Sequence, residues 1–421
     1  MSLVEPHSRR RALPARALTR CRACTANGLL PILSLGATPL ANALLTQEDL
    51  AYPETRYPLN LYFCPSCSLL QISEVVSPRE LFGEYLYLSS FSDTVLANAE
   101  SLARRLVGRQ RLGKDSLVVE VASNDGYLLK QYQDLGIQVL GVEPARNIAK
   151  IALERGVPTI AEFFGPELAE HLTFAGQFAD VLHANNVLAH VPDLNGFVKA
   201  MALVLKEDGL ASVEVPYVKR LVDDLEFDTI YHEHLSYFSV ASLKNLFERH
   251  KLIIVDVERL PVHGGSLRVL LAHHGRPSAT VKRLLLTELE VGLGQPAYYE
   301  NFADRVRSFR QRLLRLLKDE KRRGHSIAAY GASAKGTTLL NYCGVGSELV
   351  DYVVDRSTIK HGLFTPGTHL PICPPEVLME RRPDLVLLLT WNLADEILGQ
   401  QKRYRELGGR FLIPFPTLRY A

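Results

Sequence analysis

Residues 117–143 limit the fold of this chain more than any other segment. Residues 117–122 (LVVEVA) form an apolar run interrupted by one acid, a pattern typical of a buried parallel strand. Residues 123–126 (SNDG) then indicate a turn, a helical pattern begins at Tyr127, and a second apolar run ends on Glu143. The segment therefore predicts a strand, a turn, a helix and a second parallel strand that carries an acid at its tip.

The acid at the tip of the second strand indicates a ligand. Such an acid accepts hydrogen bonds from both ribose hydroxyls of an adenosine-containing cofactor. A dinucleotide needs the turn G-x-G-x-x-G, because the backbone must approach a pyrophosphate closely, whereas this turn contains only Gly126. We therefore expect S-adenosylmethionine and a methyltransferase, and a strand–helix–strand unit without a ligand is the alternative. The candidate cofactor-binding residues in this unit are Glu120, Ser123, Asn124, Asp125, Gly126 and Glu143.

The elements after this unit continue the alternation of strands and helices. Residues 178–186, 194–205 and 211–216 are predicted as the fourth strand, a helix and the fifth strand. The order predicts a parallel sheet that binds its ligands at the carboxyl ends of the strands. Three further cofactor-binding candidates follow, the first of them for the adenine amino group: Glu162, Asn185 and Asn186.

Four of the six cysteines form two C-x-x-C pairs, Cys21 with Cys24 and Cys64 with Cys67. Each pair places two thiolates on one tight turn, and two such turns complete a tetrahedral zinc site. All four ligand positions are filled by cysteine, so we expect structural zinc and not a catalytic metal. Two structural disulfides or free thiols are the alternative.

Composition excludes several classes of protein. A chain of 421 residues holds about two or three domains, and 47% hydrophobic with 22% charged residues is typical of globular proteins. The net charge of +2 gives no nucleic-acid footprint, and no apolar run has the length of a transmembrane helix. Residues 1–18 are arginine-rich but lack the apolar core of a secretory signal. We expect a disordered tail there and a cytoplasmic protein.

The densest group of titratable side chains is Tyr231, His232, Glu233 and His234, which follows the predicted fifth strand in the sequence. A histidine removes a proton near neutral pH, a neighbouring acid can orient it, and a tyrosine can donate to a developing oxyanion. The group suits removal of a proton next to a carbonyl, followed by attack of the enolate on a methyl group. A metal site through His232 and His234 and a purely structural cluster are the alternatives.

A second α/β unit follows a charged helical connector, residues 275–323. Residues 326–330 are predicted as a strand, and a turn of small residues, 331–336, opens a helix. A helix N-terminus offers backbone N–H groups and a positive dipole end to an anion, and Lys335 adds a charge. The unit predicts phosphate or pyrophosphate binding, and an empty Rossmann-like support domain is the alternative.

Four motifs in this order resemble the sugar C-methyltransferases of deoxysugar biosynthesis: the two C-x-x-C pairs, E-V-A-S-N-D-G, Y-H-E-H-L-S-Y-F-S and Y-G-A-S-A-K-G. The chain is most similar to the C-3'-methyltransferases that act on nucleotide-linked 4-keto sugars, over roughly residues 18–421. The resemblance implies a zinc-binding N-terminal domain with disordered first residues (1–75) and a central class I methyltransferase domain with a Rossmann-like fold (76–275). It also implies a C-terminal Rossmann-like domain (276–421) that helps to hold the nucleotide sugar.

The resemblance also implies roles for individual residues. His234 is the expected base, with Tyr231 and Glu233 beside the sugar. The expected substrate-binding residues are Tyr85, which would close over the site, Ser333, Lys335 and Asn392. Apart from the resemblance, His190 beside Asn185 and Asn186 is a further substrate-binding candidate, and a histidine that is only hydrogen-bonded is the alternative. Residues 355–358 (DRST) depart from the family's D-x-N-P, in a loop that would lie near the nucleotide.

The sequence thus predicts a monomeric, S-adenosylmethionine-dependent C-methyltransferase with structural zinc. Its expected substrate is a dTDP-linked keto-deoxysugar destined for a glycosylated natural product such as an antibiotic, and no nucleic-acid or membrane partner is expected. One alternative is the same fold acting on a sugar oxygen or a small keto acid. The other is a non-catalytic protein that binds zinc and a nucleotide sugar.

Overall fold

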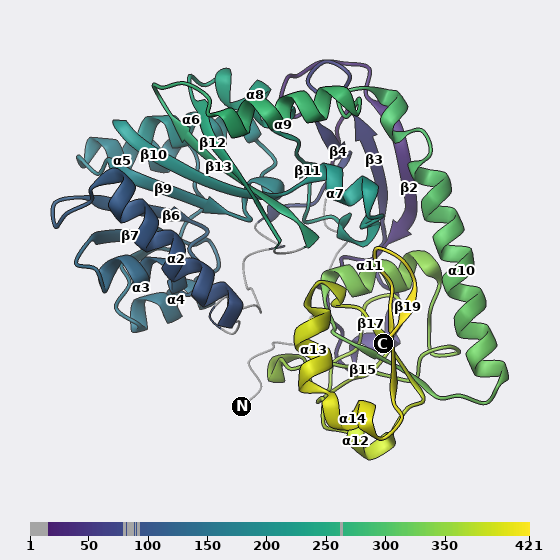
Figure 1. Cartoon of the computed structure of the whole chain (residues 1–421). Helices are drawn as coiled ribbons and strands as arrows, with labels where there is room; N and C mark the ends of the chain where they lie inside the picture. Colours follow the sequence, from purple (N-terminus) through teal and green to yellow (C-terminus); the bar gives the residue numbers. More distant parts are fainter. Residues whose placement is uncertain (1–15, 79–80, 82–87, 89, 91–92, 262–263) are drawn as a thin grey trace.

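Three larger β-sheets and one two-stranded sheet organise the part of the chain that the structure describes. The computed structural model describes residues 16–78, 81, 88, 90, 93–261 and 264–421 (Figure 1). The long helix α10 (Phe302–Arg322) runs along one side of the molecule, where it packs against the N-terminal sheet and against the first helix of the C-terminal sheet (Figure 1). The predicted mixed α/β class is confirmed.

The central sheet has seven strands in the order β12-β13-β10-β9-β6-β7-β8. Their bounds are β6 (Leu117–Val121), β7 (Gln138–Val142), β8 (Thr159–Ile160), β9 (Ala179–Asn185), β10 (Leu205–Pro216), β12 (Ile253–Leu260) and β13 (Ser266–Ala272). Strands β6 to β10 run parallel, and β13 lies antiparallel between β10 and β12. The chain leaves β6 for β7 on one side and later returns to β9 on the other. The carboxyl end of β6 is therefore the topological switch point at which such sheets bind ligands.

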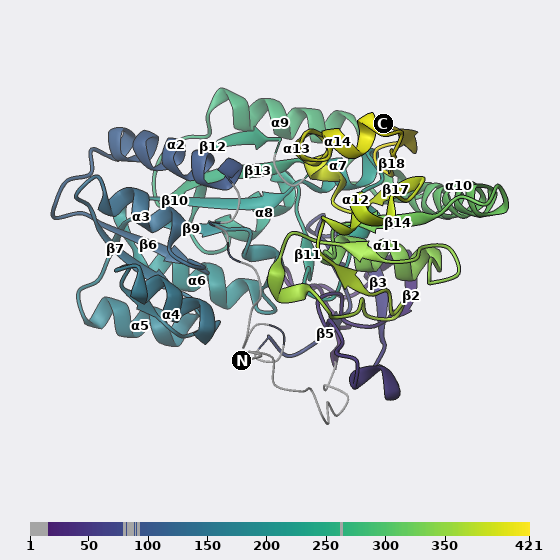
Figure 2. The ribbon, with the colours of Figure 1, turned by 90° about the horizontal axis from the view of Figure 1, so that it is seen from below.

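Helices cover both faces of the central sheet, which explains why its parallel strands β6, β7 and β9 are rich in buried apolar residues. On β6, Val118 packs into a core with Leu102 of α2 and Leu128 of α3, whereas Val119 belongs to the core that contains α5 and α6. Figure 2 shows α2 on one side of the strands and α5 and α6 on the other. The helices of this part are α2 (Asp93–Gln110), α3 (Tyr127–Gln133), α4 (Arg146–Glu154), α5 (Pro166–Phe174), α6 (Leu194–Val204), α7 (Val218–Asp223), α8 (Val240–Glu248) and α9 (Ala279–Glu290).

The N-terminal sheet is completed by a strand from far along the chain. Its order is β11-β4-β3-β2, with β2 (Leu30–Thr38), β3 (Tyr57–Phe63), β4 (Leu70–Ile72) and β11 (Ser236–Tyr237). Strand β11 pairs with β4 in antiparallel register and directly follows the predicted tyrosine–histidine cluster. The pairing of β11 with β4 therefore attaches the tyrosine–histidine cluster to the N-terminal sheet.

The predicted disordered tail is partly wrong. Residues 16–17 form β1 (Arg16–Ala17), which pairs with β5 (Glu74–Val75), and the amide of Leu18 donates to the carbonyl of Ser73. The edge of β5 offers backbone partners that the composition of the tail does not reveal. Residues 1–15 lie outside the described part of the chain.

The C-terminal sheet has the order β16-β15-β14-β17-β18-β19, and all its strands except β19 are parallel. Its elements are β14 (Ile327–Tyr330), α11 (Ala334–Cys343), β15 (Val353–Val354), β16 (Ile372–Cys373), α12 (Val377–Arg381), β17 (Leu385–Leu388), α13 (Ala394–Gln400), α14 (Lys402–Glu406), β18 (Arg410–Ile413) and β19 (Arg419–Tyr420). Within residues 349–355, only β15 pairs in the sheet. Leu349 and Val350 are buried without strand partners, so their apolar character reflects burial alone.

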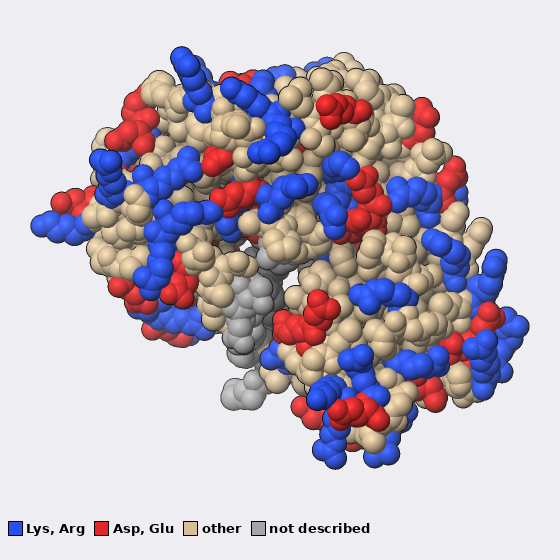
Figure 3. All heavy atoms as spheres, in the orientation of Figure 1, with Lys and Arg blue, Asp and Glu red and all other residues tan. Residues whose placement is uncertain are grey.

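Charged side chains of both signs are mixed on one face of the molecule (Figure 3). On the face in Figure 3, Lys and Arg are interspersed with Asp and Glu, as the net charge of +2 requires. Within the described residues, no helix combines the length and the apolar character needed to cross a membrane.

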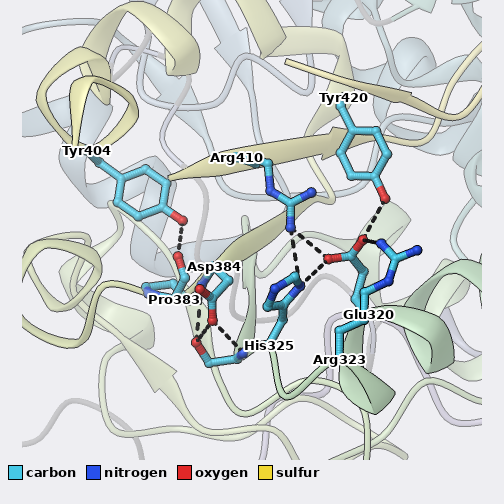
Figure 4. A network of polar contacts seen from close by, with 9 residues as sticks. Glu320, Arg323, His325, Pro383, Asp384, Tyr404, Arg410 and Tyr420 are labelled. Atoms are coloured by element: carbon cyan, nitrogen blue, oxygen red, sulfur yellow. Dashed lines mark hydrogen bonds and ion pairs between the residues drawn. The ribbon is translucent and has the colours of Figure 1, made fainter. Parts of the chain in front are cut away.

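Glu320, near the end of α10, ties the last strands of the chain together (Figure 4). Its carboxylate accepts hydrogen bonds from Arg410 of β18 at 2.7 Å, Tyr420 of β19 at 3.1 Å and His325 at 2.7 Å. The side chain is 2% exposed. Burial raises the pKa of Glu320, but these hydrogen bonds outweigh burial and hold the pKa below its ordinary value.

A carboxylate with a lowered pKa stabilises the fold above its ordinary pKa, and that contribution is lost as the pH falls through the lowered value. We expect Glu320→Gln to reduce the free energy of unfolding at pH 7 by about 1–3 kcal/mol. The difference from the unmodified protein should shrink below about pH 4. Urea unfolding at pH 7 and below about pH 4 measures this difference in the free energy of unfolding. Glu290→Gln, at an exposed position on α9, is the control, and an equal effect of both changes at pH 7 would contradict the role of Glu320.

Candidate active site and metal centre

A cavity of about 710 Å³ opens at the carboxyl ends of the central strands. Its wall includes Ala122 and Asn124 after β6, Glu143 after β7, and Asn185 at the end of β9. The cavity continues past the switch point of the sheet to a second group of residues: Asn186, His190, Thr229, Tyr231, His234 and Lys335. One continuous space thus joins the predicted cofactor site to the predicted chemical centre.

Glu143 is held in one orientation at the cavity wall. Its two carboxylate oxygens accept hydrogen bonds from the backbone amides of Asn124 and Ala145, both at 2.9 Å. Burial raises the pKa of Glu143, and the two amides counteract that rise. A fixed acid at the tip of the second strand is the group that binds the ribose hydroxyls of an adenosine. The residues present therefore fit S-adenosylmethionine.

The loop after β6 is tightly folded. Ala122 and Asn124 adopt positive φ values of 54° and 50°, a conformation that residues other than glycine adopt rarely and mostly at functional sites. Gly126 follows with φ 79°, and a Cβ there would lie 2.8 Å from Val157. The single glycine of the turn is thus required by the close approach of Val157.

Other predicted cofactor residues support the site from behind. Asp125 is fully buried and forms an ion pair with Arg155 at 2.6 Å. Glu120 is 1% exposed, and its pKa is raised well above the ordinary value by burial and by Glu143 and Asp125. Ser123 is also buried, against Gly141. None of these three predicted residues lines the cavity.

Glu162 lies elsewhere than its predicted role requires. It is exposed and absent from the cavity wall, whereas its neighbours Phe163 and Phe164 line the cavity. The assignment of Glu162 to the adenine amino group stays a prediction. The two adjacent aromatic residues are the signal in the sequence that could have marked this part of the wall.

Tyr231 and His234 form a hydrogen-bonded pair in the cavity. Nδ1 of His234 lies 2.9 Å from the carbonyl oxygen of Thr229, so Nδ1 carries the proton. Nε2 is then the acceptor, and it receives the hydroxyl of Tyr231 at 2.9 Å. The basic nitrogen of His234 thus faces the phenol, and a carbonyl group orients the ring where the sequence suggested a neighbouring acid.

His190 packs against this pair without adding charge. Its ring meets the ring of His234 edge-on, with centroids 4.8 Å apart. Burial lowers the pKa of His190 to about 4, although hydrogen bonds with the backbone of Glu233 and Asn186 act in the opposite direction. His190 is therefore neutral near pH 7 and does not oppose a proton on His234.

Glu233 and His232 face the N-terminal sheet instead of the cavity. Asn42 donates to both carboxylate oxygens of Glu233, at 2.8 and 3.0 Å, and burial raises the pKa of Glu233 to about 7. His232 contacts the carbonyl of Pro58 at 3.1 Å. Because His232 and His234 point to different partners, the geometry does not support a metal site between them.

Lys335 reaches the cavity from the start of α11 and is surrounded by acids. Burial lowers the pKa of Lys335, while the nearby Asp228 and Glu226 favour its charged form. Burial also raises the pKa of Glu226 to about 8 and the pKa of Asp228 to about 6. Nζ lies 4.7 Å from the centre of the Trp391 ring, and the indole N–H donates to Asp228 at 2.7 Å. Sequence reasoning missed this cluster, because its members are far apart in the chain.

Two further substrate candidates, Ser333 and Asn392, do not line the cavity. Ser333 caps α11 by accepting from the amide of Gly336 at 3.2 Å, and Asn392 is half-buried next to Trp391. Tyr85 lies outside the described residues.

The four cysteines predicted as zinc ligands come together. Their sulfur atoms all lie within 4.8 Å of one another, with Cys21 and Cys67 at 3.5 Å and Cys24 and Cys64 at 3.5 Å. These separations are too long for disulfides and close to the ~3.8 Å expected for thiolates around one zinc ion. The hydrogen bond with Cys67 lowers the pKa of Cys21, whereas burial raises the pKa of Cys64. In the described part of the chain this is the one metal-binding group found.

Comparison with known proteins adds three family matches. They are a zinc binding domain over residues 21–82, a methyltransferase domain over residues 95–257 and a C-methyltransferase C-terminal domain over residues 261–416. The C-methyltransferase NovU of Streptomyces niveus is 39% identical over 409 residues, which span 96% of this chain and 97% of NovU. A ubiquinone biosynthesis O-methyltransferase of Methylobacterium sp. (strain 4-46) is 29% identical over 30% of this chain and 53% of its own length.

The solved structure of magnesium protoporphyrin IX methyltransferase (ChlM) from Synechocystis PCC 6803 with bound SAM shares 12% identity. It covers 47% of this chain and 89% of its own, with a TM-score of 0.34. The family matches and the cavity with Glu143 define an S-adenosylmethionine-dependent methyltransferase. The chain belongs to the C-methyltransferase family, because NovU matches nearly its whole length. The family predicted from the four motifs is confirmed. The comparisons do not support the alternatives of an O-methyltransferase and a non-catalytic binding protein.

We expect Glu143→Ala to lower the affinity for S-adenosylmethionine by at least about tenfold, because two charge-assisted hydrogen bonds to the ribose are lost. Isothermal titration calorimetry measures the affinity. Glu170→Ala, at an exposed position on α5, is the matched control and should bind as the unmodified protein does. An unchanged affinity of Glu143→Ala would contradict the placement of the adenosine.

Proposed function

We propose that the protein methylates a carbon next to the ketone of a dTDP-linked keto-deoxysugar, at C-3', in the biosynthesis of a glycosylated natural product. One observation carries the proposal: a single cavity joins Glu143 to the Tyr231–His234 pair and to Lys335. A cofactor, a carbon acid and an anionic group can therefore be held in one space. The C-methyltransferase relative NovU supports carbon as the acceptor.

His234 is the base in this proposal. S-adenosylmethionine, when bound, supplies the electrophilic methyl group on sulfur. Nε2 of His234 takes the proton from the acceptor carbon, while the hydrogen bond from Nδ1 to Thr229 keeps the ring in position. The hydroxyl of Tyr231 leaves Nε2 and donates to the ketone oxygen, where negative charge develops as the C–H bond breaks. This exchange of partners frees the base only when a ketone is present.

The C-terminal sheet suits the nucleotide end of the substrate. Its switch point lies at the carboxyl ends of β14 and β17, and Ser333 and Asn392 follow these two strands. Lys335, in the first turn of α11, adds a positive charge between this edge and the cavity. We assign Ser333, Lys335 and Asn392 to binding of the diphosphate, and Tyr85 and His190 to binding of the sugar. We place the domain boundaries near residues 75 and 275. A cytoplasmic monomer completes the proposal.

We expect His234→Asn to bind both ligands while turnover falls by about 10²–10⁴-fold, the usual contribution of a general base. The variant should also lose deuterium exchange at the acceptor carbon, measured by NMR with S-adenosylhomocysteine bound. Exchange separates loss of the base from a misplaced sugar. Tyr231→Phe should lose less turnover, because only one oxyanion donor is removed. Exchange at the unmodified rate in His234→Asn would place the base elsewhere.

The nucleotide assignment has its own test. We expect Lys335→Met, which keeps the length of the side chain but removes its charge, to weaken dTDP binding by at least about tenfold. Binding of S-adenosylhomocysteine should change little, and calorimetry with each ligand measures both. If the affinities for both ligands fell equally, or if neither changed, the C-terminal sheet would have only a structural role. A small keto acid would then be favoured as the acceptor.

A further inference from the structure

Arg22 connects the cysteine cluster to the catalytic segment. It lies between Cys21 and Cys24 in sequence, yet its side chain is 7% exposed and points away from solvent. Its Nη1 donates to the carbonyl of Ile72 at 2.6 Å and to the carbonyl of Leu235 at 3.0 Å. Leu235 directly follows His234, so one guanidinium nitrogen spans from the metal-binding turn to the residue next to the base.

The peptide that Arg22 contacts is held from two further directions. The carbonyl of Leu235 also accepts the amide of Ile72 at 3.1 Å, where β4 meets β11. The amide of Leu235 donates to the carbonyl of Ala189 at 2.7 Å, on the loop that carries His190. A shift of Arg22 would therefore move the backbone at the point where the two histidines of the cavity meet.

The cysteine cluster is itself fixed to the central part of the molecule. Asn195 of α6 donates to the carbonyls of Arg22 and Ala23 at 2.9 and 3.0 Å, and Asn245 of α8 donates to the carbonyl of Cys67 at 3.3 Å. Both metal-binding turns are thus bound to helices of the central sheet. The cysteine cluster is therefore anchored to the central part of the molecule and is not a detached module.

Charge links the metal to Arg22. In the described part of the chain, Arg22 forms no ion pair with a carboxylate. Four thiolates around one divalent ion carry a net charge of about −2, which compensates a buried guanidinium nearby.

We propose that Arg22 is a positioning residue: through the carbonyl of Leu235 it couples metal binding at the four cysteines to the placement of His234. The metal then acts on the rate of methyl transfer through geometry, at a distance from the reacting atoms. The proposal rests on the proposed role of His234 as the base.

The first test uses the unmodified full-length protein. Zinc is removed with a chelator, and backbone hydrogen–deuterium exchange is followed by mass spectrometry. We expect exchange of residues 231–237 to accelerate at least about tenfold on zinc removal, while residues 117–127 at the cofactor loop stay protected. Unchanged exchange of residues 231–237 would overturn the proposal. Acceleration over the whole chain would also overturn it, because zinc would then support the fold in general.

The second test compares Arg22→Met with Arg20→Met, an exposed arginine of the same turn region. We expect Arg22→Met to keep one zinc per chain and its affinity for S-adenosylhomocysteine, while kcat falls by about 10- to 100-fold at little change in KM. Deuterium exchange at the acceptor carbon should fall in parallel, and Arg22→Lys should restore part of it. Arg20→Met should behave as the unmodified protein does. Unmodified turnover in Arg22→Met would overturn the proposal.

The two proposals fail in different ways. If His234→Asn exchanges deuterium at the unmodified rate, the assignment of the base is wrong, whatever Arg22→Met does. If His234→Asn is inactive and Arg22→Met has unmodified turnover, only the role of Arg22 is wrong. Should Arg22→Met fail to fold, the chelation experiment on the unmodified protein still decides the question.

Discussion

The carbonyl of Thr229 accepts a hydrogen bond from Nδ1 of His234, and this contact decides which ring nitrogen is available for proton transfer. A histidine whose tautomer is fixed presents its basic nitrogen in one direction, here toward Tyr231 and the cavity. The contact requires that residues 229 and 234 keep their separation. Further polar contacts hold the short segment on which both residues lie, among them the bond from Trp391 to Asp228 and the bonds from Asn42 to Glu233.

Both outer sheets hold this segment, one at each end. Before Thr229, the carboxylate of Asp228 accepts from Trp391 of the C-terminal part and lies close to the charge of Lys335. After His234, strand β11 pairs with β4 of the N-terminal sheet. The Tyr231–His234 pair therefore lies at the junction of three sheets, and the short segment that carries it joins the C-terminal part of the chain to the N-terminal sheet.

The parts of the site that could be predicted from the sequence are those with a local pattern. The unit around Glu143 and the two C-x-x-C pairs are short motifs whose spacing follows from backbone geometry, and both are present as expected. The orientation of His234 was not predictable, since its partner is a backbone carbonyl and carries no side-chain signal. The contacts Asn42 to Glu233 and Trp391 to Asp228 join residues 191 and 163 positions apart, so no local period marks them.

The N-terminal sheet shows why a metal belongs in an enzyme whose chemistry does not need one. Strand β4 has three residues and β11 has two, and strands this short are not stable as an isolated pair. The second cysteine pair, Cys64 and Cys67, lies in the turn between β3 and β4, so metal binding fixes that hairpin directly. The hairpin then presents a rigid edge to β11. Since a displacement of about 1 Å in a catalytic group can cost about a hundredfold in rate, a metal-stabilised edge is a physically sufficient reason for the cysteine cluster.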